Sequence, residues 1–243
     1  MENPTYIALS RQMALRRELE VVAHNIANMN TPAYKAERMI FREFLIEQDA
    51  KGAEDLSFTQ DVGQARDLRE GSKVSTGNDL DLALSGEGYF LIDTADGPRY
   101  TRHGRFQLDA LRQLVTGEGD IVVAFSDDPI VVPPDAGRIE IAGDGTISTE
   151  VGTIGKVKVV AFEDPYALKR EPNSLYSAEE APRTVARPTI VQGMLEQSNV
   201  HGVLELTRLI EIQREHQSVQ HMLNRENERQ QKAIDRIAKQ RGA

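Results

Sequence analysis

The two ends of the chain repeat apolar residues at helical spacing, and the middle does not. Residues 5–30 contain neither proline nor glycine, and their large aliphatic residues recur at alternating steps of four and three, at Leu15, Leu19, Val22 and Ile26. This spacing places the four side chains on one face of a helix. We expect Pro32 to end that helix, because proline lacks a backbone donor and restricts the residue before it.

A longer stretch with the same period occupies residues 203–240. Its apolar positions include Leu209, Ile212, Val219 and Leu223, but several positions of the same stripe are polar. A helix of about 38 residues would be about 57 Å long, which exceeds the roughly 46 Å diameter of a compact globule of this size. We therefore expect the terminal helices to form a coiled-coil-like pair that packs into other copies of the chain or a related protein. The alternative is a helix folded along its own domain.

Between the ends the period changes to two and turn residues multiply. Turn sequences such as Asp96-Gly97, Pro133-Pro134 and Gly143-Asp144-Gly145 separate short runs of alternating polarity. Regularly spaced runs of this kind are typical of an all-β domain. Short strands are expected at residues 88–93, 119–125, 128–132, 138–142, 146–149 and 156–162.

These patterns predict an α+β protein in which an all-β middle domain is inserted between long N- and C-terminal helices. The middle also holds 27 of the 38 acidic residues, so we expect it to stay solvated while the near-neutral ends meet partners. The predicted regions are an N-terminal helical region at 1–46, an extended arm at 47–76, a β-rich outer domain at 77–170, a return arm at 171–199 and a C-terminal helix at 200–243.

Composition argues against several classes of function. The formal charge of −9 argues against a dedicated nucleic-acid binder, and the absence of cysteine excludes disulfides, thiolate zinc sites and cysteine nucleophiles. Aromatic residues make up only 5% of the chain, so few side chains can stack on bases or sugars. Neither a cleavable secretory signal nor a run of about 18 apolar residues is visible, so we expect no membrane insertion.

Motifs for catalysis, cofactors and metals are missing from the sequence. His216 and His221 are five residues apart, which does not place them on one helix face as metal ligands. Gly86-Glu87-Gly88 lacks the third glycine of a dinucleotide loop and is better interpreted as a turn. Asp79 and Asp81 could act as paired carboxylates in glycoside hydrolysis, but the shortage of aromatic residues argues against a sugar site. We expect no enzyme activity and no catalytic, cofactor or metal site.

Polar amides cluster where the N-terminal helix is expected to end, and they include Asn25 and Asn28. Such side chains bond well to neighbouring backbone, and Asn is favoured at the C-terminal ends of helices. The cluster therefore predicts a C-cap and a polar joint between helix and arm, which are compatible.

Four motifs, in order along the chain, resemble the flagellar axial family of rod and hook proteins. They occupy residues 23–35 (AHNIANMNTPAYK), 80–90 (LDLALSGEGYF), 100–106 (YTRHGRF) and 192–200 (QGMLEQSNV), the last continuing into Glu205-Leu206 and Leu209-Ile210. Together they span most of the chain, and their order makes the resemblance specific.

The resemblance implies a structural subunit of the bacterial flagellar basal-body rod, exported by the flagellar type III apparatus and assembled in the periplasm as part of the drive shaft for motility. Its partners would be itself and other rod proteins, without a cofactor. Chain length and the opening residues favour a proximal-rod member, with a distal-rod member as the alternative. From a different class, the chain could be a periplasmic enzyme or a carbohydrate-binding β domain dimerised by its helices.

The same resemblance assigns expected site residues. Those at subunit interfaces are Leu15, Leu19, Val22, Asn25, Ile26, Asn28, Leu206, Leu209, Ile212, Val219 and Leu223. Those of the structural motifs are Thr31, Tyr34, Asp81, Gly86, Gly88, Phe90, Gly104, Phe106, Gly193 and Asn199.

Two positions make local predictions. Ala33 stands where the family usually has glycine, so a positive φ would be disfavoured there and the local turn is expected to differ. Gly88, between a charged and an aromatic residue, is expected to supply a bulge, a positive φ or a close backbone approach.

Overall fold

The computed structural model describes residues 3–46 and 56–241, and the chain divides into two compact units. The helical unit comprises residues 1–27, 37–67 and 200–243, and the β unit comprises residues 28–36 and 68–199. An N-terminal helix, a β-rich middle and a C-terminal helix follow one another along the chain, which confirms the predicted α+β class.

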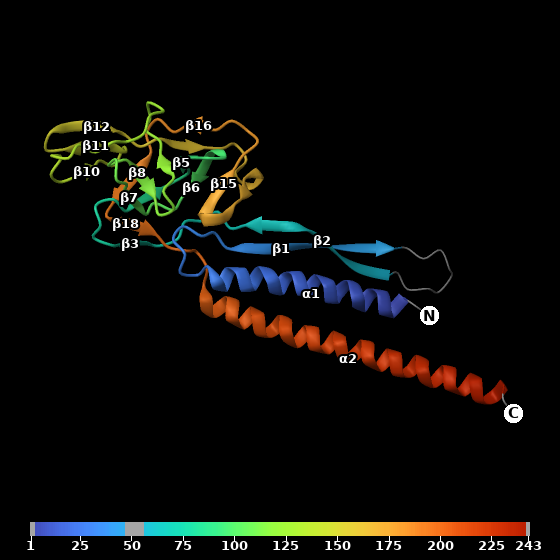
Figure 1. The fold of residues 1–243 in the computed structure, drawn as a ribbon. Helices are drawn as coiled ribbons and strands as arrows, with labels where there is room; N and C mark the ends of the chain where they lie inside the picture. Colours follow the sequence, from blue (N-terminus) through green and yellow to red (C-terminus); the bar gives the residue numbers. More distant parts are fainter. Residues whose placement is uncertain (1–2, 47–55, 242–243) are drawn as a thin grey trace. The chain divides into compact units, whose positions relative to one another are not determined.

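The helical unit contains two helices and a two-stranded ribbon. Its elements are α1 (Asn3–Ala27), β1 (Glu37–Ile46), β2 (Leu56–Arg66) and α2 (Gly202–Arg241). Strands β1 and β2 pair antiparallel, with a bulge between Ile40 and Phe41. Helix α1 lies between α2 on one side and the ribbon on the other (Figure 1).

Two boundaries differ from the sequence expectations. Helix α1 ends at Ala27, before Pro32, because the chain turns there and the Thr31 N–H donates to the Asn28 carbonyl at 3.1 Å. The segment expected as an extended arm at 47–76 contributes β2 to the ribbon and the strand β3 (Lys73–Ser75) to the β unit. Residues 47–55 of this segment lie outside the described residues. The five predicted regions otherwise stay a prediction.

A nine-stranded antiparallel sheet forms the centre of the β unit. Its main path runs through β14 (Lys169–Arg170), β15 (Leu175–Ser177), β6 (Gly97–Thr101), β5 (Tyr89–Thr94), β9 (Ile121–Val122), β8 (Leu114–Thr116) and β7 (Phe106–Leu108). Off this path, β13 (Val159–Ala161) pairs with β5 and with β16 (Arg183–Thr184).

Three smaller antiparallel sheets complete the β unit. They are β10 (Glu140–Ile141), β11 (Thr146–Thr149) and β12 (Gly152–Lys156); β4 (Leu82–Ser85) with β17 (Thr189–Gln192); and β3 (Lys73–Ser75) with β18 (Met194–Glu196). Two short 3-10 helices span Pro165–Ala167 and Pro172–Ser174. The segment at 171–199, expected as a return arm, thus supplies four strands.

The strand predictions succeeded unevenly. The strand at Thr146–Thr149 is confirmed, and the runs at 88–93, 119–125, 138–142 and 156–162 contain strands that are shifted or shorter. Residues 128–132 form only isolated bridges, Val123 with Pro129 and Gln113 with Val131. Pro129 explains part of this difference, because it cannot donate to a β-ladder.

Besides a smaller cluster rich in tyrosine and phenylalanine, the β unit has a larger and predominantly aliphatic core, as the low aromatic content suggests. Phe90 and Phe106 meet edge to face within it, with ring centroids 5.2 Å apart. Gly104 lies beside them, and its carbonyl accepts from the Leu82 N–H at 2.8 Å. A Cβ on Gly104 would lie 1.7 Å from the Leu82 oxygen, so this close approach requires glycine.

Ala33 adopts φ +58°, the left-handed conformation that its side chain disfavours. Alanine therefore adopts here the positive φ that was expected to be disfavoured, and a difference from the family's turn stays a prediction. The Ala33 N–H donates to the Glu196 carbonyl at 2.8 Å, which holds the backbone in this conformation.

Candidate functional site

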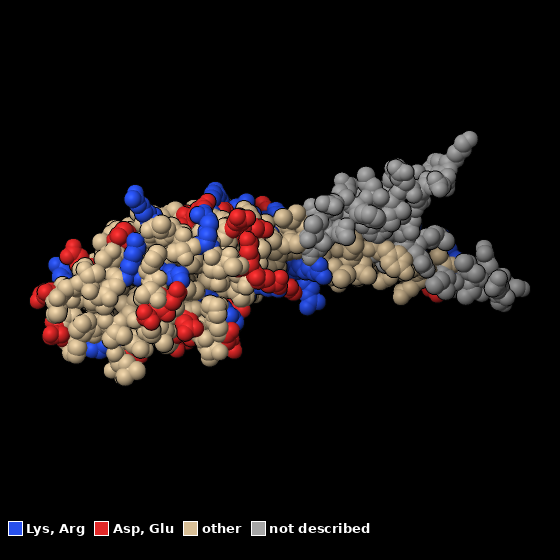
Figure 2. All heavy atoms as spheres, turned by 90° about the horizontal axis from the view of Figure 1, so that it is seen from above, with Lys and Arg blue, Asp and Glu red and all other residues tan. Residues whose placement is uncertain are grey.

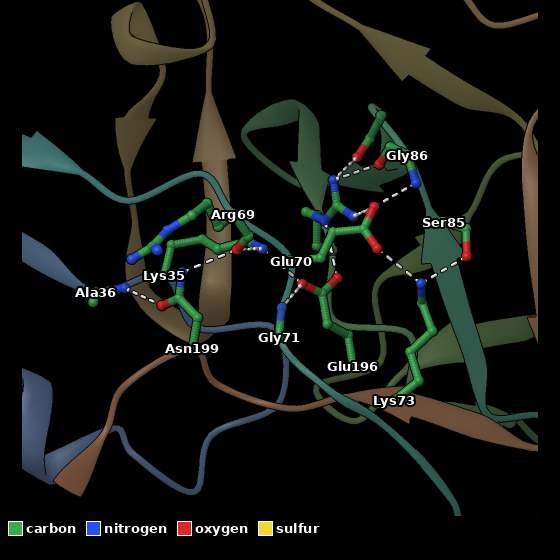
Figure 3. Close-up of polar contacts among 12 residues, drawn as sticks. Lys35, Ala36, Arg69, Glu70, Gly71, Lys73, Ser85, Gly86, Glu196 and Asn199 are labelled. Atoms are coloured by element: carbon green, nitrogen blue, oxygen red, sulfur yellow. Dashed lines mark hydrogen bonds and ion pairs between the residues drawn. The ribbon is translucent and has the colours of Figure 1, made fainter.

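Three charged side chains of the β unit, Lys35, Arg102 and Glu196, form a buried charge cluster. The Lys35 Nζ lies 2.6 Å from Glu196 Oε1, and the Arg102 Nε lies 3.1 Å from Glu196 Oε2. Their side chains are 4%, 7% and 0% exposed, respectively. Figure 3 shows Lys35 and Glu196 among segments that are distant in the sequence. Each oxygen of the single carboxylate thus faces a cation in place of water.

Backbone groups add further hydrogen bonds to the charge cluster. The Gly71 N–H donates to Glu196 Oε1 at 3.0 Å, and the Lys35 ammonium donates to the Arg69 carbonyl at 2.8 Å. A Cβ on Gly71 would lie 1.9 Å from the Gln197 carbonyl oxygen, so this approach again requires glycine. Burial lowers the pKa of Lys35, and the charge of Glu196 opposes that shift.

The turn from Gly86 to Gly88 binds Arg102. The Arg102 Nη1 donates to the Gly86 carbonyl at 3.0 Å and to the Gly88 carbonyl at 3.3 Å. Gly86 has φ +83° and Gly88 has φ +137°. A Cβ on Gly88 would also lie 2.7 Å from Val159 Cγ1, which agrees with the expected need for glycine at this position.

Glu70, Lys73 and Ser85 form a polar rim beside the cluster (Figure 3). The Lys73 Nζ lies 2.8 Å from Glu70 Oε2 and 2.6 Å from Ser85 Oγ, and the Gly86 N–H donates to Glu70 Oε1. Partial burial opposes ionisation of Glu70, but the Lys73 and Gly86 hydrogen bonds and the charges of Lys73 and Arg102 outweigh it and lower its pKa.

Asn199 joins the first and fourth motifs. Its Oδ1 accepts from the Ala36 N–H at 2.7 Å, its Nδ2 donates to the Arg69 carbonyl at 2.9 Å, and its N–H donates to the Tyr34 carbonyl at 3.3 Å. The Arg170 guanidinium lies over the Tyr34 ring, 4.4 Å from its centroid. Thr31, also a predicted motif residue, donates through its hydroxyl to Asn28 Oδ1 at 3.2 Å.

Asp81 joins the second and fourth motifs. Its buried carboxylate accepts from Thr76 Oγ1 at 2.6 Å and from Asn78 Nδ2 at 3.1 Å. Its carbonyl accepts from the Gly193 N–H at 2.8 Å, where Gly193 turns with φ +72°. Asp81 therefore stabilises the backbone around Asn78 and the turn at Gly193.

In the helical unit, Asn25 joins segments that are distant in the sequence. Its side-chain amide forms a two-way pair with the Glu37 backbone, donating to the carbonyl at 2.8 Å and accepting from the N–H at 3.0 Å. Its Nδ2 also donates to Glu205 Oε2 of α2 at 3.2 Å. Asn25 is only 1% exposed, so one amide links the end of α1 to the start of β1 and to α2. The predicted polar joint between helix and arm is present, and it consists of hydrogen bonds from Asn25 to the backbone of Glu37 at the start of β1.

The seam of the helical unit joins α1 to α2 within one chain. Leu15, Val22 and Ile212 form its buried centre, and the side chains packed against them are Leu19, Ile26, Leu209 and Val219. Arg208 Nε donates to Glu18 Oε1 at 2.9 Å across the same two helices. Seven of the expected interface residues therefore meet one another inside the chain.

Other apolar side chains of the two helices face outwards. Leu206, predicted at an interface, is 49% exposed, while Leu223 is half-buried. Among the helix side chains whose exposure the structure describes, the exposed large apolar ones are Tyr6, Leu9 and Met13 on α1 and Val203, Leu204, Leu206, Ile210 and Met222 on α2. We call these eight residues the exposed apolar rows.

Comparison with protein families assigns the chain. Three family descriptions match: "Flagella basal body rod protein" at residues 6–35, "Flagellar hook protein FlgE/F/G D1 domain" at 83–149, and "Flagellar basal body rod FlgEFG protein C-terminal" at 191–236. The flagellar basal-body rod protein FlgF of Caulobacter vibrioides is 38% identical over 98% of this chain and 99% of its own length.

The chain belongs to the flagellar rod and hook protein family. Two further relatives are FlgF of Mesorhizobium japonicum, 34% identical over 88% of this chain and 89% of its own length, and FlgG of Bacillus subtilis, 33% identical over 88% and 90%. The family resemblance inferred from the four motifs is confirmed. It identifies a structural protein of the flagellar basal-body rod.

Sequence reasoning did not single out Lys35, Arg102 or Glu196 as site residues of this rod protein. Each lies inside a motif: Lys35 ends the first, Arg102 lies in the third and Glu196 lies in the fourth. Their positions inside the motifs were the available signal. Their pairing could not be inferred, because Lys35 and Glu196 are 161 residues apart.

Within residues 3–46 and 56–241, no three His, Asp or Glu side chains gather as metal ligands. No described helix combines the length and apolar character needed to cross a bilayer. On the face shown in Figure 2, acidic and basic side chains of the β unit are interspersed. This face therefore presents no extended basic surface of the kind that binds nucleic acid.

We expect the chain to lose stability as the pH falls below about 6.5, partly through His103. Burial and the nearby Arg105 lower the pKa of His103, while Asp81 opposes the shift. Between the lowered folded value and the unfolded value of about 6.5, the unfolded chain binds a proton that the folded chain does not. As the pH decreases through this window, the free energy of unfolding therefore decreases.

His103→Gln should reduce this pH dependence in urea titrations of the full chain at pH 5.5 and 7. The exposed His201→Gln is the matched control, and it should keep the wild-type difference between the two pH values. An unchanged difference in His103→Gln would show that another group is responsible.

Proposed function

We propose that this chain is a proximal-rod subunit that polymerises with itself and with other rod proteins through its terminal helices. The exposed apolar rows are the observation that carries the proposal. These eight side chains are not part of the seam, whose buried centre consists of Leu15, Val22 and Ile212 of the same chain. A soluble surface seldom exposes so many large apolar side chains on two neighbouring helices without a partner.

The seam and the exposed apolar rows have different roles in this proposal. The seam holds α1 against α2, and the exposed apolar rows contact neighbouring subunits in the periplasmic rod. The similarity to FlgF proteins supports the proximal position, and no catalytic step is required of the subunit. Export through the flagellar type III apparatus belongs to the same proposal.

Leu206→Asp should abolish rod assembly and swimming without unfolding the monomer. The substitution places a charge in an apolar contact between subunits, where desolvation without a partner is costly. Leu206 is 49% exposed in the chain itself, so the monomer should lose less than about 1 kcal/mol. Basal bodies isolated from cells that express only the variant measure assembly, and circular dichroism measures folding.

Gln217→Asp provides the matched control, because it adds the same charge at an exposed polar position of α2. Cells with this control should swim. Normal basal bodies from Leu206→Asp cells would overturn the assignment of this row. A photo-reactive residue at Ile210 that cross-links to no rod subunit would overturn the proposed contacts of this row.

A further inference from the structure

A cavity in the β unit combines apolar walls with the guanidinium of Arg102. Its volume is about 330 Å³, near the lower limit for small-molecule sites. Leu68, Tyr89, Phe162 and Pro165 contribute apolar surface, and Lys35 also lines it. The cavity therefore offers an apolar enclosure beside two buried cations of the charge cluster.

One nitrogen of Arg102 lacks a hydrogen-bond acceptor. Arg102 Nε donates to Glu196 and Nη1 donates to the Gly86 and Gly88 carbonyls, but the buried Nη2 has no hydrogen-bond partner among the described residues. Its nearest paired carboxylate, Glu70 Oε1, is 3.8 Å away. A charged donor that is buried without an acceptor is costly, so this atom favours an incoming acceptor.

The charges around the cavity also favour an anion. The charged residues that line the cavity are three cations, Lys35, Arg69 and Arg102, and two carboxylates, Glu70 and Glu87. The lining therefore carries one positive charge more than it carries negative charges. A carboxylate would supply both the negative charge and the oxygen acceptor that Arg102 Nη2 lacks.

We propose that this cavity binds a carboxylate carried on a small apolar group, with the carboxylate at Arg102 Nη2 and the apolar group against Tyr89 and Phe162. The ligand is either a free aromatic or aliphatic carboxylate or the carboxylate of a peptide segment from another protein copy. The site is independent of the exposed apolar rows, because it lies wholly within the β unit.

Benzoate is the probe, and benzamide, its uncharged analogue of similar shape, is the matched control ligand. Titrated into the full-length protein at constant ionic strength, benzoate should raise the melting temperature in a saturable manner, whereas benzamide should not. Equal responses to the two, or no saturable response to benzoate, would overturn the proposal and leave solvent as the occupant.

Two variants sharpen the test. Glu70→Gln removes the carboxylate that competes for Arg102, so the half-saturating benzoate concentration should fall about fivefold. Leu68→Phe narrows the cavity and should abolish the response while circular dichroism remains unchanged. If Leu68→Phe fails to fold, Glu70→Gln still decides: unchanged or weaker binding there contradicts the proposal.

A final measurement distinguishes the sources of the carboxylate. Sedimentation of concentrated protein with and without saturating benzoate reports whether the probe displaces another copy. Reduced self-association identifies a peptide carboxylate as the natural occupant, and unchanged self-association identifies a free ligand. Because rod assembly through Leu206 is measured separately, failure of this site leaves the proposed function intact.

Discussion

Replacing Glu196 by alanine is expected to lower the free energy of unfolding by about 3–5 kcal/mol. The substitution leaves Lys35 and Arg102 buried without the carboxylate that pairs with both. It also removes the acceptor of the Gly71 N–H. Burial would then lower the pKa of Lys35 further, because Glu196 would no longer oppose that shift.

Urea titration of the full chain, followed by far-ultraviolet circular dichroism, measures this loss. Glu179→Ala is the matched control: Glu179 pairs with Lys169 at 2.5 Å, but its side chain is 85% exposed. Because solvent screens such a surface pair, Glu179→Ala should leave the urea midpoint almost unchanged. If the free energy of unfolding of Glu196→Ala lies within about 1 kcal/mol of the wild-type value, the charge cluster does not hold these segments together.

Several features could be predicted from the sequence because they depend on local pattern. The spacing of Leu15 to Ile26 and of Leu209 to Val219 predicted two helices, and the packed faces are the ones that carry these residues. The backbone role of Gly88 was likewise predictable, because a glycine between a charged and an aromatic residue indicates a special backbone conformation. In these cases the sequence signal lies within a few neighbouring residues, although the contacts it serves, such as that of Gly88 with Val159, are between distant segments.

The remaining features depend on contacts between distant segments. The ribbon of β1 and β2 was not predicted, because strand pairing across a connection leaves little local signal in a charged sequence. The charge cluster combines residues from three motifs, and a single sequence does not show which carboxylate pairs with which cation. Asn25 was recognised as polar and functional, but its two-way pair with the Glu37 backbone needs the folded chain.

Ile212→Asp is expected to separate α1 from α2 and to abolish rod assembly. Ile212 is 1% exposed and packs at the centre of the seam with Leu15 and Val22. A carboxylate there is buried without a cation, and the lost packing adds to that cost, for a total of more than about 3 kcal/mol in the helical unit. Limited proteolysis of the dilute monomer should cleave both terminal helices faster than in the wild type and leave the β unit resistant.

Comparing Ile212→Asp with Leu206→Asp separates folding of the chain from assembly of the rod. Both variants add a carboxylate to α2 and both should stop swimming, but only Ile212→Asp should expose the helices to protease in the monomer. Leu206 lies outside the seam, so its variant should resist protease as the wild type does. If the helices of the dilute wild type are already cleaved as fast as those of Ile212→Asp, the seam forms only on assembly. The energetic reason would be that the seven apolar residues of the seam contribute too little free energy to offset the ordering of two long helices, so neighbouring subunits must supply further contacts.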